Sequence, residues 1–184
     1  NAFDTVYHEH LSYWSLRALQ MLLNAHGLRA MRVEWFPALH GGSVRIVAEH
    51  GMGGELPNDD APVRDPLAYR EWGARIVGVI GTIRDELRPV EHDLVGFGAP
   101  AKATVLLNAT GVLPRVVYDD TPAKQGRWVP GVNVPVEAPP ASLRGATHAV
   151  VLAWNWLADI QRRFATLGFA GCLFVPLPQP RWLD

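Results

Sequence analysis

The stretch DLVGFGAPAK, residues 93–102, decides the fold of this chain. Its apolar start predicts a short buried strand, Gly96 and Gly98 predict a tight turn, and a helix is expected from Lys102 onward. Such a turn lets backbone N–H groups meet an anion at the start of the helix. The stretch fits the dinucleotide-binding pattern G-x-G-x-x-A, although Pro100 removes one N–H donor. Gly96, Gly98 and Lys102 are therefore candidate ligand-binding residues, and a turn that serves only backbone geometry is the alternative.

Downstream of this turn, the sequence alternates between strand and helix patterns. We predict a helix, a strand, a second strand, a helix and a last strand at residues 102–111, 115–120, 148–153, 157–167 and 172–175. Such alternation is typical of a parallel sheet with helices on both faces, because crossovers between parallel strands are right-handed. We therefore predict an α/β fold over residues 91–184, with a Rossmann-like, mostly parallel sheet and flanking helices.

The first half of the chain is predicted to lead into this sheet. Leucine and tryptophan spacing predicts a helix over residues 11–26, with Ser12 or Ser15 as its cap and Gly27 at its end. Two strands, a loop and a long helix follow at residues 29–35, 43–48, 51–66 and 67–87. Residues 3–90 then form a lead-in of helix, strand pair and helix. From the length of 184 residues we expect one domain over residues 3–184, with Asn1 and Ala2 as the remnant of a cleaved tag.

The composition is that of a globular protein without a strong charge. Hydrophobic residues make up 48% and charged residues 19% of the chain, which predicts a packed core. The formal net charge of -1 gives no electrostatic footprint for nucleic acid or an anionic membrane, and no apolar run is long enough to span a bilayer. Cys172 is the single cysteine, which excludes an internal disulfide and a thiolate zinc site. We expect a reduced, cytoplasmic setting and no metal in this chain.

The tetrapeptide Tyr7-His8-Glu9-His10 gathers groups suited to proton transfer. Two imidazoles, a carboxylate and a phenol offer a base, an orienting group and a hydrogen-bond donor. In an extended segment, His8 and His10 point to one face, and Tyr7 and Glu9 to the other. The alternative is a polar helix N-terminus at which the helix dipole favours Glu9. A zinc site lacks a third ligand at a usual spacing.

Further candidates lie in two glycine-containing loops. His40 and Ser43 flank glycines that permit close approach of the backbone to a ligand, and a simple turn between strands is the alternative. Asp119 ends a predicted strand roughly 20 residues after the glycine turn, where a dinucleotide-binding fold places an acidic residue. Lys124 and Arg127 follow at the same sheet edge and are suited to hold phosphate, with a solvated loop as the alternative.

Trp154 and Asn155 stand between a predicted strand and a predicted helix. Tryptophan at this place either joins the core or stacks on a base or sugar, and we expect at least one of Trp154 and Trp156 to be core. Asn155 is a suitable N-cap for the helix.

Five of these segments, in this order, resemble the C-terminal domain of the S-adenosylmethionine-dependent sugar C-methyltransferases. The segments are FDTVYHEHLSY, HGGSVR, GFGAPAK, TPAKQG and LAWN, at residues 3–13, 40–45, 96–102, 121–126 and 152–155. The resemblance spans nearly the whole chain, and the first segment is its most specific part. At Ala103 and Thr104 the chain departs from the Gly-Asn pair that is frequent in the family.

The resemblance implies that this chain is the substrate-side domain of a three-domain enzyme. The other two would be an N-terminal zinc-binding domain and a middle domain that holds most of the S-adenosylmethionine, so the isolated chain would be inactive. The acceptor would be a nucleotide-linked keto-deoxysugar. By the same resemblance, His10 is the general base, with Tyr7, Glu9 and His8 beside it, and the glycine turn belongs to the sugar side.

Two other readings follow from the glycine turn. One is a nicotinamide-dependent oxidoreductase, in which Asp119 or Asp120 would bind the cofactor ribose. The other is a nucleotide-binding module without catalytic activity.

Overall fold

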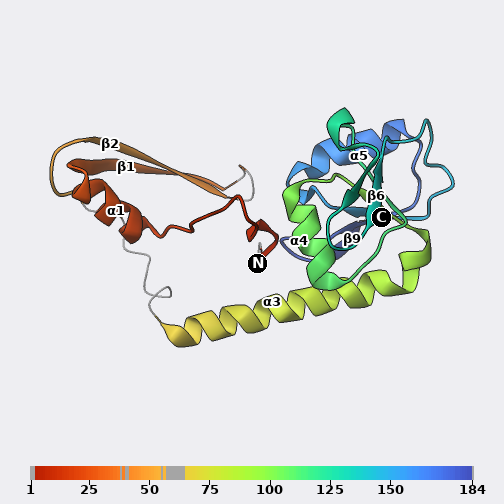
Figure 1. Cartoon of the computed structure of the whole chain (residues 1–184), viewed down its shortest axis with the longest axis horizontal. Coiled ribbons are helices and arrows are strands. Elements are labelled where there is room, and N and C mark those ends of the chain that lie inside the picture. The colour runs from red at the N-terminus through yellow and green to blue at the C-terminus, as the bar shows by residue number, and fades with distance from the viewer. Residues whose placement is uncertain (1–2, 38, 40–41, 55, 57–64, 184) are drawn as a thin grey trace. The chain divides into compact units, whose positions relative to one another are not determined.

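The computed structural model describes residues 3–37, 39, 42–54, 56 and 65–183, and these form two compact units. The first unit, here called the Rossmann unit, comprises residues 1–9 and 75–184. The second, here called the hairpin unit, comprises residues 10–74. The long helix α3 (Pro66–Leu87) contributes residues to both units (Figure 1).

The Rossmann unit is built on a seven-stranded sheet (Figure 1). Its strands are β3 (Leu94–Phe97), β4 (Val116–Tyr118), β5 (Arg127–Val129), β6 (Val134–Glu137), β7 (His148–Val151), β8 (Cys172–Val175) and β9 (Arg181–Leu183). Their order in the sheet is β5-β6-β4-β3-β7-β8-β9. The five central strands are parallel, and the edge strands β5 and β9 are antiparallel to their neighbours. The predicted Rossmann-like, mostly parallel sheet is confirmed.

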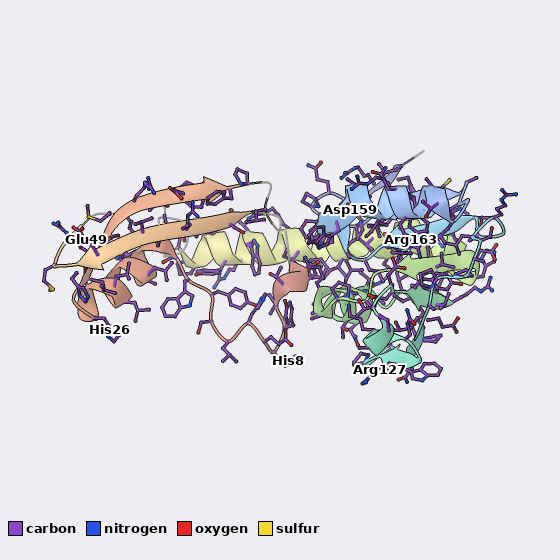
Figure 2. The ribbon with its side chains drawn as sticks, turned by 90° about the horizontal axis from the view of Figure 1, so that it is seen from above. His8, His26, Glu49, Arg127, Asp159 and Arg163 are labelled. Atoms are coloured by element: carbon purple, nitrogen blue, oxygen red, sulfur yellow. The ribbon has the colours of Figure 1, made fainter. Side chains whose placement is uncertain are left out.

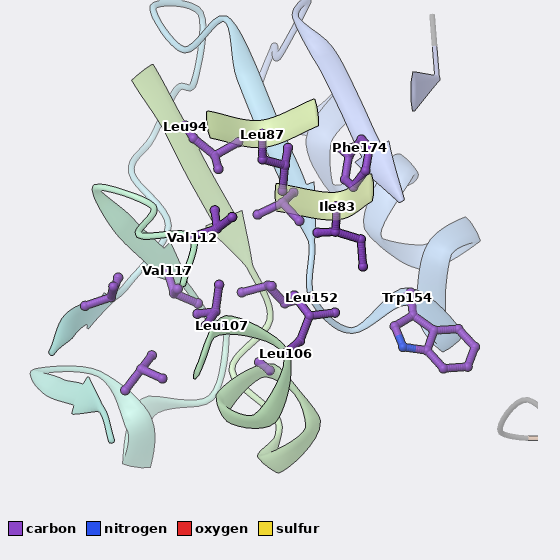
Figure 3. Packing of buried hydrophobic residues seen from close by; sticks show 14 of the residues in the cluster. Ile83, Leu87, Leu94, Leu106, Leu107, Val112, Val117, Leu152, Trp154 and Phe174 are labelled. Carbon is purple, nitrogen blue, oxygen red and sulfur yellow. The ribbon is translucent and has the colours of Figure 1, made fainter. Parts of the chain in front are cut away.

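Helices cover both faces of this sheet because its strand residues alternate between two cores. Leu94 and Val117 face the first core, which also takes residues from α3 and from α4 (Ala101–Thr110). Val95 and Phe97 face the second core, which is closed by α5 (Leu157–Thr166). Figure 3 shows the first core, in which side chains of α3 and α4 converge on those of the strands and Trp154 lies at the margin.

Four 3-10 helices connect or precede these elements. They are η1 (Phe3–Thr5), η2 (Arg88–Asp93), η3 (Pro122–Lys124) and η4 (Trp154–Trp156). The first of them packs against α4, and Phe3 is part of the first core. The N-terminal residues are therefore part of the Rossmann unit.

The hairpin unit combines the helix α1 (Leu16–Ala25) with the antiparallel strands β1 (Leu28–Phe36) and β2 (Ser43–His50). A small core of Leu16, Ala30 and Leu56 joins them. The helix is shorter than predicted because Ser15 is its N-cap and accepts a hydrogen bond from Ala18 N at 3.2 Å. Its predicted end at Gly27 is confirmed, since Gly27 has a φ of 68°.

The remaining differences from the sequence prediction concern short strands. The prediction missed β5, β6 and β9, which have three or four residues each. The strand β6 also contains Pro135. Strands this short carry too few alternating positions to show a period. The predicted loop at 51–66 lies in large part outside the described residues. Among the helices that the structure describes, none is both long and apolar enough to cross a membrane.

Candidate functional site

The strand order reverses direction at β3. The chain passes from β3 through α4 to β4 on one side, and β7 later pairs with β3 on its other side. In open parallel sheets, ligands bind at the carboxyl ends of the strands where the order reverses. This switch point lies at Phe97 and Val151, the last residues of β3 and β7.

A buried carboxylate ties the N-terminal segment to the switch point. The side chain of Asp4 is fully buried, and its Oδ2 atom accepts a hydrogen bond of 2.6 Å from Nε1 of Trp154. Within the described residues, Oδ1 of Asp4 has no hydrogen-bond partner. Burial raises the pKa of Asp4, while the hydrogen bond from Trp154 and the positive charge of Lys102 act in the opposite direction. This hydrogen bond thereby holds η1 to this edge of the sheet.

Lys102 and Asn155 complete a group of four side chains, here called the switch-point cluster, with Asp4 and Trp154. The Nζ atom of Lys102 lies 4.6 Å from the centre of the Trp154 ring and donates a hydrogen bond of 3.1 Å to Oδ1 of Asn155. An ammonium group has three donors, and among the described residues Lys102 uses one of them in this bond. Trp154 is buried and Trp156 is 54% exposed, which confirms that at least one tryptophan is core.

The prediction that Asn155 caps a helix is wrong. The N-cap of α5 is Trp156, without a side-chain hydrogen bond, and Asn155 lies inside η4. Its side-chain oxygen accepts from Lys102 instead. A sequence pattern shows the residue type before a helix but not a partner 53 positions away.

The tetrapeptide that begins at Tyr7 follows η1 directly. Its start is a bend and a turn over residues 7–9 and not an extended segment, so the two-face alternation does not apply. Glu9 also does not belong to the first turn of a helix, because α1 begins only at Leu16. Tyr7 is half-buried, His8 and Glu9 are exposed, and Figure 2 shows His8 on the loop after η1. His10 begins the hairpin unit, with its ring 6.2 Å from that of Tyr13 in an edge contact.

The two glycines of the turn allow close packing between strands. A Cβ atom at Gly96 would lie 2.9 Å from side-chain atoms of both Leu152 and Val117. Gly98 has a φ of 87°, and a Cβ atom there would lie 2.7 Å from that of Ala153. Close approach of β3 to its neighbours thus gives both positions a structural reason to be glycine.

The N–H groups of this turn are largely engaged within the protein. Gly98 N donates to the carbonyl of Tyr118 at 2.7 Å, and Ala99 N donates to Oδ2 of Asp119 at 2.6 Å. Pro100 is the N-cap of α4 and has no N–H group. The turn therefore presents fewer donors to an anion than its sequence pattern indicates.

The carboxylates after β4 are also engaged. Asp119 is buried, and it accepts hydrogen bonds from Ala99 N, from Thr121 N at 2.8 Å and from Nζ of Lys124 at 3.1 Å. Burial opposes the negative charge, but these hydrogen bonds outweigh it and hold the pKa of Asp119 below its usual value. Asp120 pairs with Arg163 at 2.8 Å. Asp119 is therefore committed to contacts within the protein, whereas Asp120 forms an exposed ion pair.

Arg127 lies beside a pocket between α4 and the β5–β6 pair. The pocket has a volume of about 570 Å³, and Lys124 also lines it. Arg127 is exposed and has no hydrogen bond or ion pair with the residues that the structure describes. Figure 2 labels Arg127 at the outer part of the Rossmann unit.

The glycine-containing loop that leads into β2 belongs to the hairpin unit. Ser43 begins β2, and its hydroxyl donates to the carbonyl of Leu39 at 3.1 Å within the link between the strands. His40 lies outside the described residues. In the described part of the chain, no group of three or more His, Cys, Asp or Glu residues is arranged to hold a metal ion.

Sequence reasoning missed Asp4 as a member of the site. The signal was its place in the specific segment FDTVYHEHLSY. Its role depends on Trp154, which is 150 positions away in the chain, so no local pattern reveals it.

Comparison with known proteins places the chain in a family. Residues 38–178 match the family described as C-methyltransferase C-terminal domain. The chain is 34% identical over 201 residues to the C-methyltransferase NovU of Streptomyces niveus, in an alignment that covers 98% of this chain. The same alignment covers 47% of NovU, so the chain spans about half the length of this curated relative. On the family match and on this identity, the chain belongs to the C-methyltransferase C-terminal domain family.

Proposed function

We propose that this chain is the domain of an S-adenosylmethionine-dependent C-methyltransferase that binds a nucleotide-linked keto-deoxysugar and carries the general base. The observation that carries the proposal is the buried hydrogen bond between Asp4 and Trp154. It holds the segment that leads into Tyr7, His8, Glu9 and His10 at the strand ends where such sheets bind ligands.

The reaction we propose begins with removal of a proton from the carbon next to a ketone. The His10 imidazole takes this proton, because a neutral imidazole nitrogen can accept a proton and later release it. The C–H electron pair moves into an enolate, whose oxygen accepts a hydrogen bond from the Tyr7 hydroxyl. Glu9 and His8 orient the base. S-adenosylmethionine supplies the methyl group that the acceptor carbon gains.

The acceptor is held in this proposal by the Rossmann unit. Among the described residues, Lys102 uses one of its three donors at the switch point, and Arg127 has no carboxylate partner. Both side chains suit the negative charge of a diphosphate. Gly96 and Gly98 shape the turn beside it, Lys124 lies next to Arg127, and Trp154 and Asn155 border the sugar. His40 and Ser43 are further proposed substrate-binding residues.

The methyl donor is proposed to be held mainly by another domain of the parent protein. The buried carboxylate of Asp119 supports this, since both of its oxygens already accept hydrogen bonds within the protein. The isolated chain would then be inactive. We place the parent protein in the cytoplasm, where the single exposed Cys172 would stay reduced.

The base role is tested in the full-length parent enzyme with His10→Ala. Deuterium uptake from heavy water at the carbon next to the ketone reports proton abstraction, and methyl transfer is followed separately. We expect both rates to fall at least 100-fold, because general-base catalysis contributes about 10²–10⁴-fold, while affinity for S-adenosylmethionine is unchanged.

The matched control is His92→Ala. His92 is an exposed histidine of η2, next to Asp93 and outside the switch-point cluster. In His92→Ala, the rates of deuterium uptake and of methyl transfer should equal those of the wild type. Deuterium uptake at the normal rate in His10→Ala would show that another group is the base.

A further inference from the structure

The pocket beside Arg127 opens at the same edge of the sheet as the switch-point cluster. Arg127 pairs with Val136 near the carboxyl end of β6, while the cluster stands at the carboxyl end of β7. Arg127 lies on β5, and four strand spacings separate β5 from β7 in the sheet order, which is roughly 19 Å. A single extended ligand can therefore reach both places along one edge.

The floor and the inner wall of the pocket are apolar and formed by small or branched side chains. Ala103 on α4 and Val129 and Val136 on the strands line it and are almost completely buried. Ala99 adds a second alanine on the α4 side, and Thr104 adds a hydroxyl group. The alanines leave room between α4 and the strands, in a space of about 570 Å³ that can take a ring.

The mouth of the pocket carries positive charge. Side chains alternate along β5, so Arg127 shares the sheet face of Val129, which belongs to the first core with α4. Lys124 is paired with Asp119, whereas Arg127 has no carboxylate partner in the described part of the chain. One uncompensated guanidinium thus stands over an apolar space.

We propose that this pocket is the subsite for the base of a nucleoside diphosphate, with Arg127 contacting its phosphates. The inference rests on the proposed function and names where the nucleotide end of the acceptor binds. From this subsite the diphosphate passes the first turn of α4, and the sugar reaches Lys102 and Trp154.

The apolar floor of the pocket and the charge of Arg127 together select this class of ligand. A free phosphate would leave the apolar floor unused, and an uncharged ring would leave Arg127 without a partner. The sulfonium group of S-adenosylmethionine is positive and would be repelled by Arg127.

The experiment measures binding to this 184-residue chain by calorimetry, with thymidine diphosphate, thymidine and inorganic pyrophosphate as probes. Thr104→Phe narrows the pocket, with Thr104→Ser, which keeps the hydroxyl group, as its control. Arg127→Ala removes the charge, with Arg162→Ala as its control, because Arg162 is an exposed arginine on α5 at the other sheet face. Amide NMR shifts of the wild-type chain with thymidine diphosphate give an independent map if Thr104→Phe does not fold.

We expect Thr104→Phe to lower the affinity for thymidine and for thymidine diphosphate at least tenfold. The affinity for pyrophosphate should be unchanged. Arg127→Ala should lower the affinity for thymidine diphosphate and for pyrophosphate at least tenfold. Its effect on the affinity for thymidine should be less than twofold. The shifts should centre on Ala99, Ala103, Thr104 and Val136. Unchanged binding in Thr104→Phe, shifts away from this pocket, or no binding of thymidine diphosphate would overturn the proposal.

Failure of this inference can be told apart from failure of the proposed function. If His10→Ala stops deuterium uptake in the parent enzyme while Thr104→Phe keeps the wild-type KM for the nucleotide sugar, only the base subsite is wrong. If the nucleotide binds in this pocket but His10→Ala keeps normal uptake, the subsite stands and the base assignment fails.

Discussion

Asp4 is a carboxylic acid buried among apolar side chains, which costs free energy unless the group is hydrogen-bonded or neutral. One oxygen has the Trp154 indole as its donor, and the other has no partner among the described residues. Burial raises the pKa of Asp4, which means that the folded chain favours its protonated form. A residue with a structural penalty of this kind is expected where it holds a functional segment in place.

The raised pKa of Asp4 predicts a pH dependence of stability. Between the ordinary value of 3.8 and the raised value, the folded state binds more protons than the unfolded state. The contribution of Asp4 to the free energy of unfolding is therefore largest below pH 3.8 and is lost as pH rises through the folded pKa. Asp4→Asn keeps an acceptor for Trp154 and cannot ionise, so it should lack this loss.

Urea unfolding of the wild type and of Asp4→Asn across pH 3–7 measures the effect. The stability of Asp4→Asn relative to wild type should rise with pH. Asp85→Asn is the control, because Asp85 is an exposed aspartate of α3 that should show no such trend. A constant difference between wild type and Asp4→Asn would contradict the expected ionisation of Asp4.

At the scale of elements, the helices end where local backbone chemistry requires it. Helix α4 ends at Gly111, which has a φ of 67° and donates its N–H to the carbonyl of Leu107 at 2.8 Å. Gly78 lies instead inside α3 and continues the helix. A Cβ atom would meet nothing within 4 Å at either position, so only backbone conformation distinguishes them.

Alanine substitutions at these two glycines should have opposite effects. Gly111→Ala should lower the free energy of unfolding by about 1–2 kcal/mol, because left-handed backbone is unfavourable for a residue with a Cβ atom. Gly78→Ala should raise it by about 0.5–1 kcal/mol, since alanine loses less entropy in a helix. Chemical denaturation measures both values. Equal effects of the same sign would show that something other than the backbone conformation matters at these sites.

At the scale of the molecule, we propose a nucleotide site on the Rossmann unit, in which Asp119 and Asp120 after β4 pair with groups of the protein itself. A ligand that binds only the folded state raises the free energy of unfolding. The increase grows with the ratio of the free ligand concentration to its Kd. Thymidine diphosphate at 100 times its Kd should therefore stabilise the chain by about 2.7 kcal/mol and raise its Tm.

S-adenosylmethionine at the same concentration should leave the Tm unchanged. Differential scanning calorimetry of the chain with each ligand checks both expectations. A comparable rise with S-adenosylmethionine would mean that this chain itself holds the methyl donor, contrary to the proposed division between domains.

Local sequence predicted the elements that carry enough residues to show a period or a cap. The strands β3, β4, β7 and β8 and the helices α3, α4 and α5 were predicted at nearly their observed bounds, because buried apolar runs and terminal glycines are local signals. β5, β6 and β9 were missed, since three or four residues become a strand only through pairing with a distant partner. Local propensity holds no information on such pairing.

The sequence by itself determined the α/β class of the fold, the strand–glycine turn–helix at residues 93–102 and the residues able to carry proton chemistry. Only the tertiary structure decided which of them share a site. It joined Asp4 to Trp154 and Lys102 to Asn155, and it gave the acids after β4 to partners within the protein. The physical reason is that strand order, burial and hydrogen bonding depend on contacts between distant parts of the chain, which local patterns do not encode.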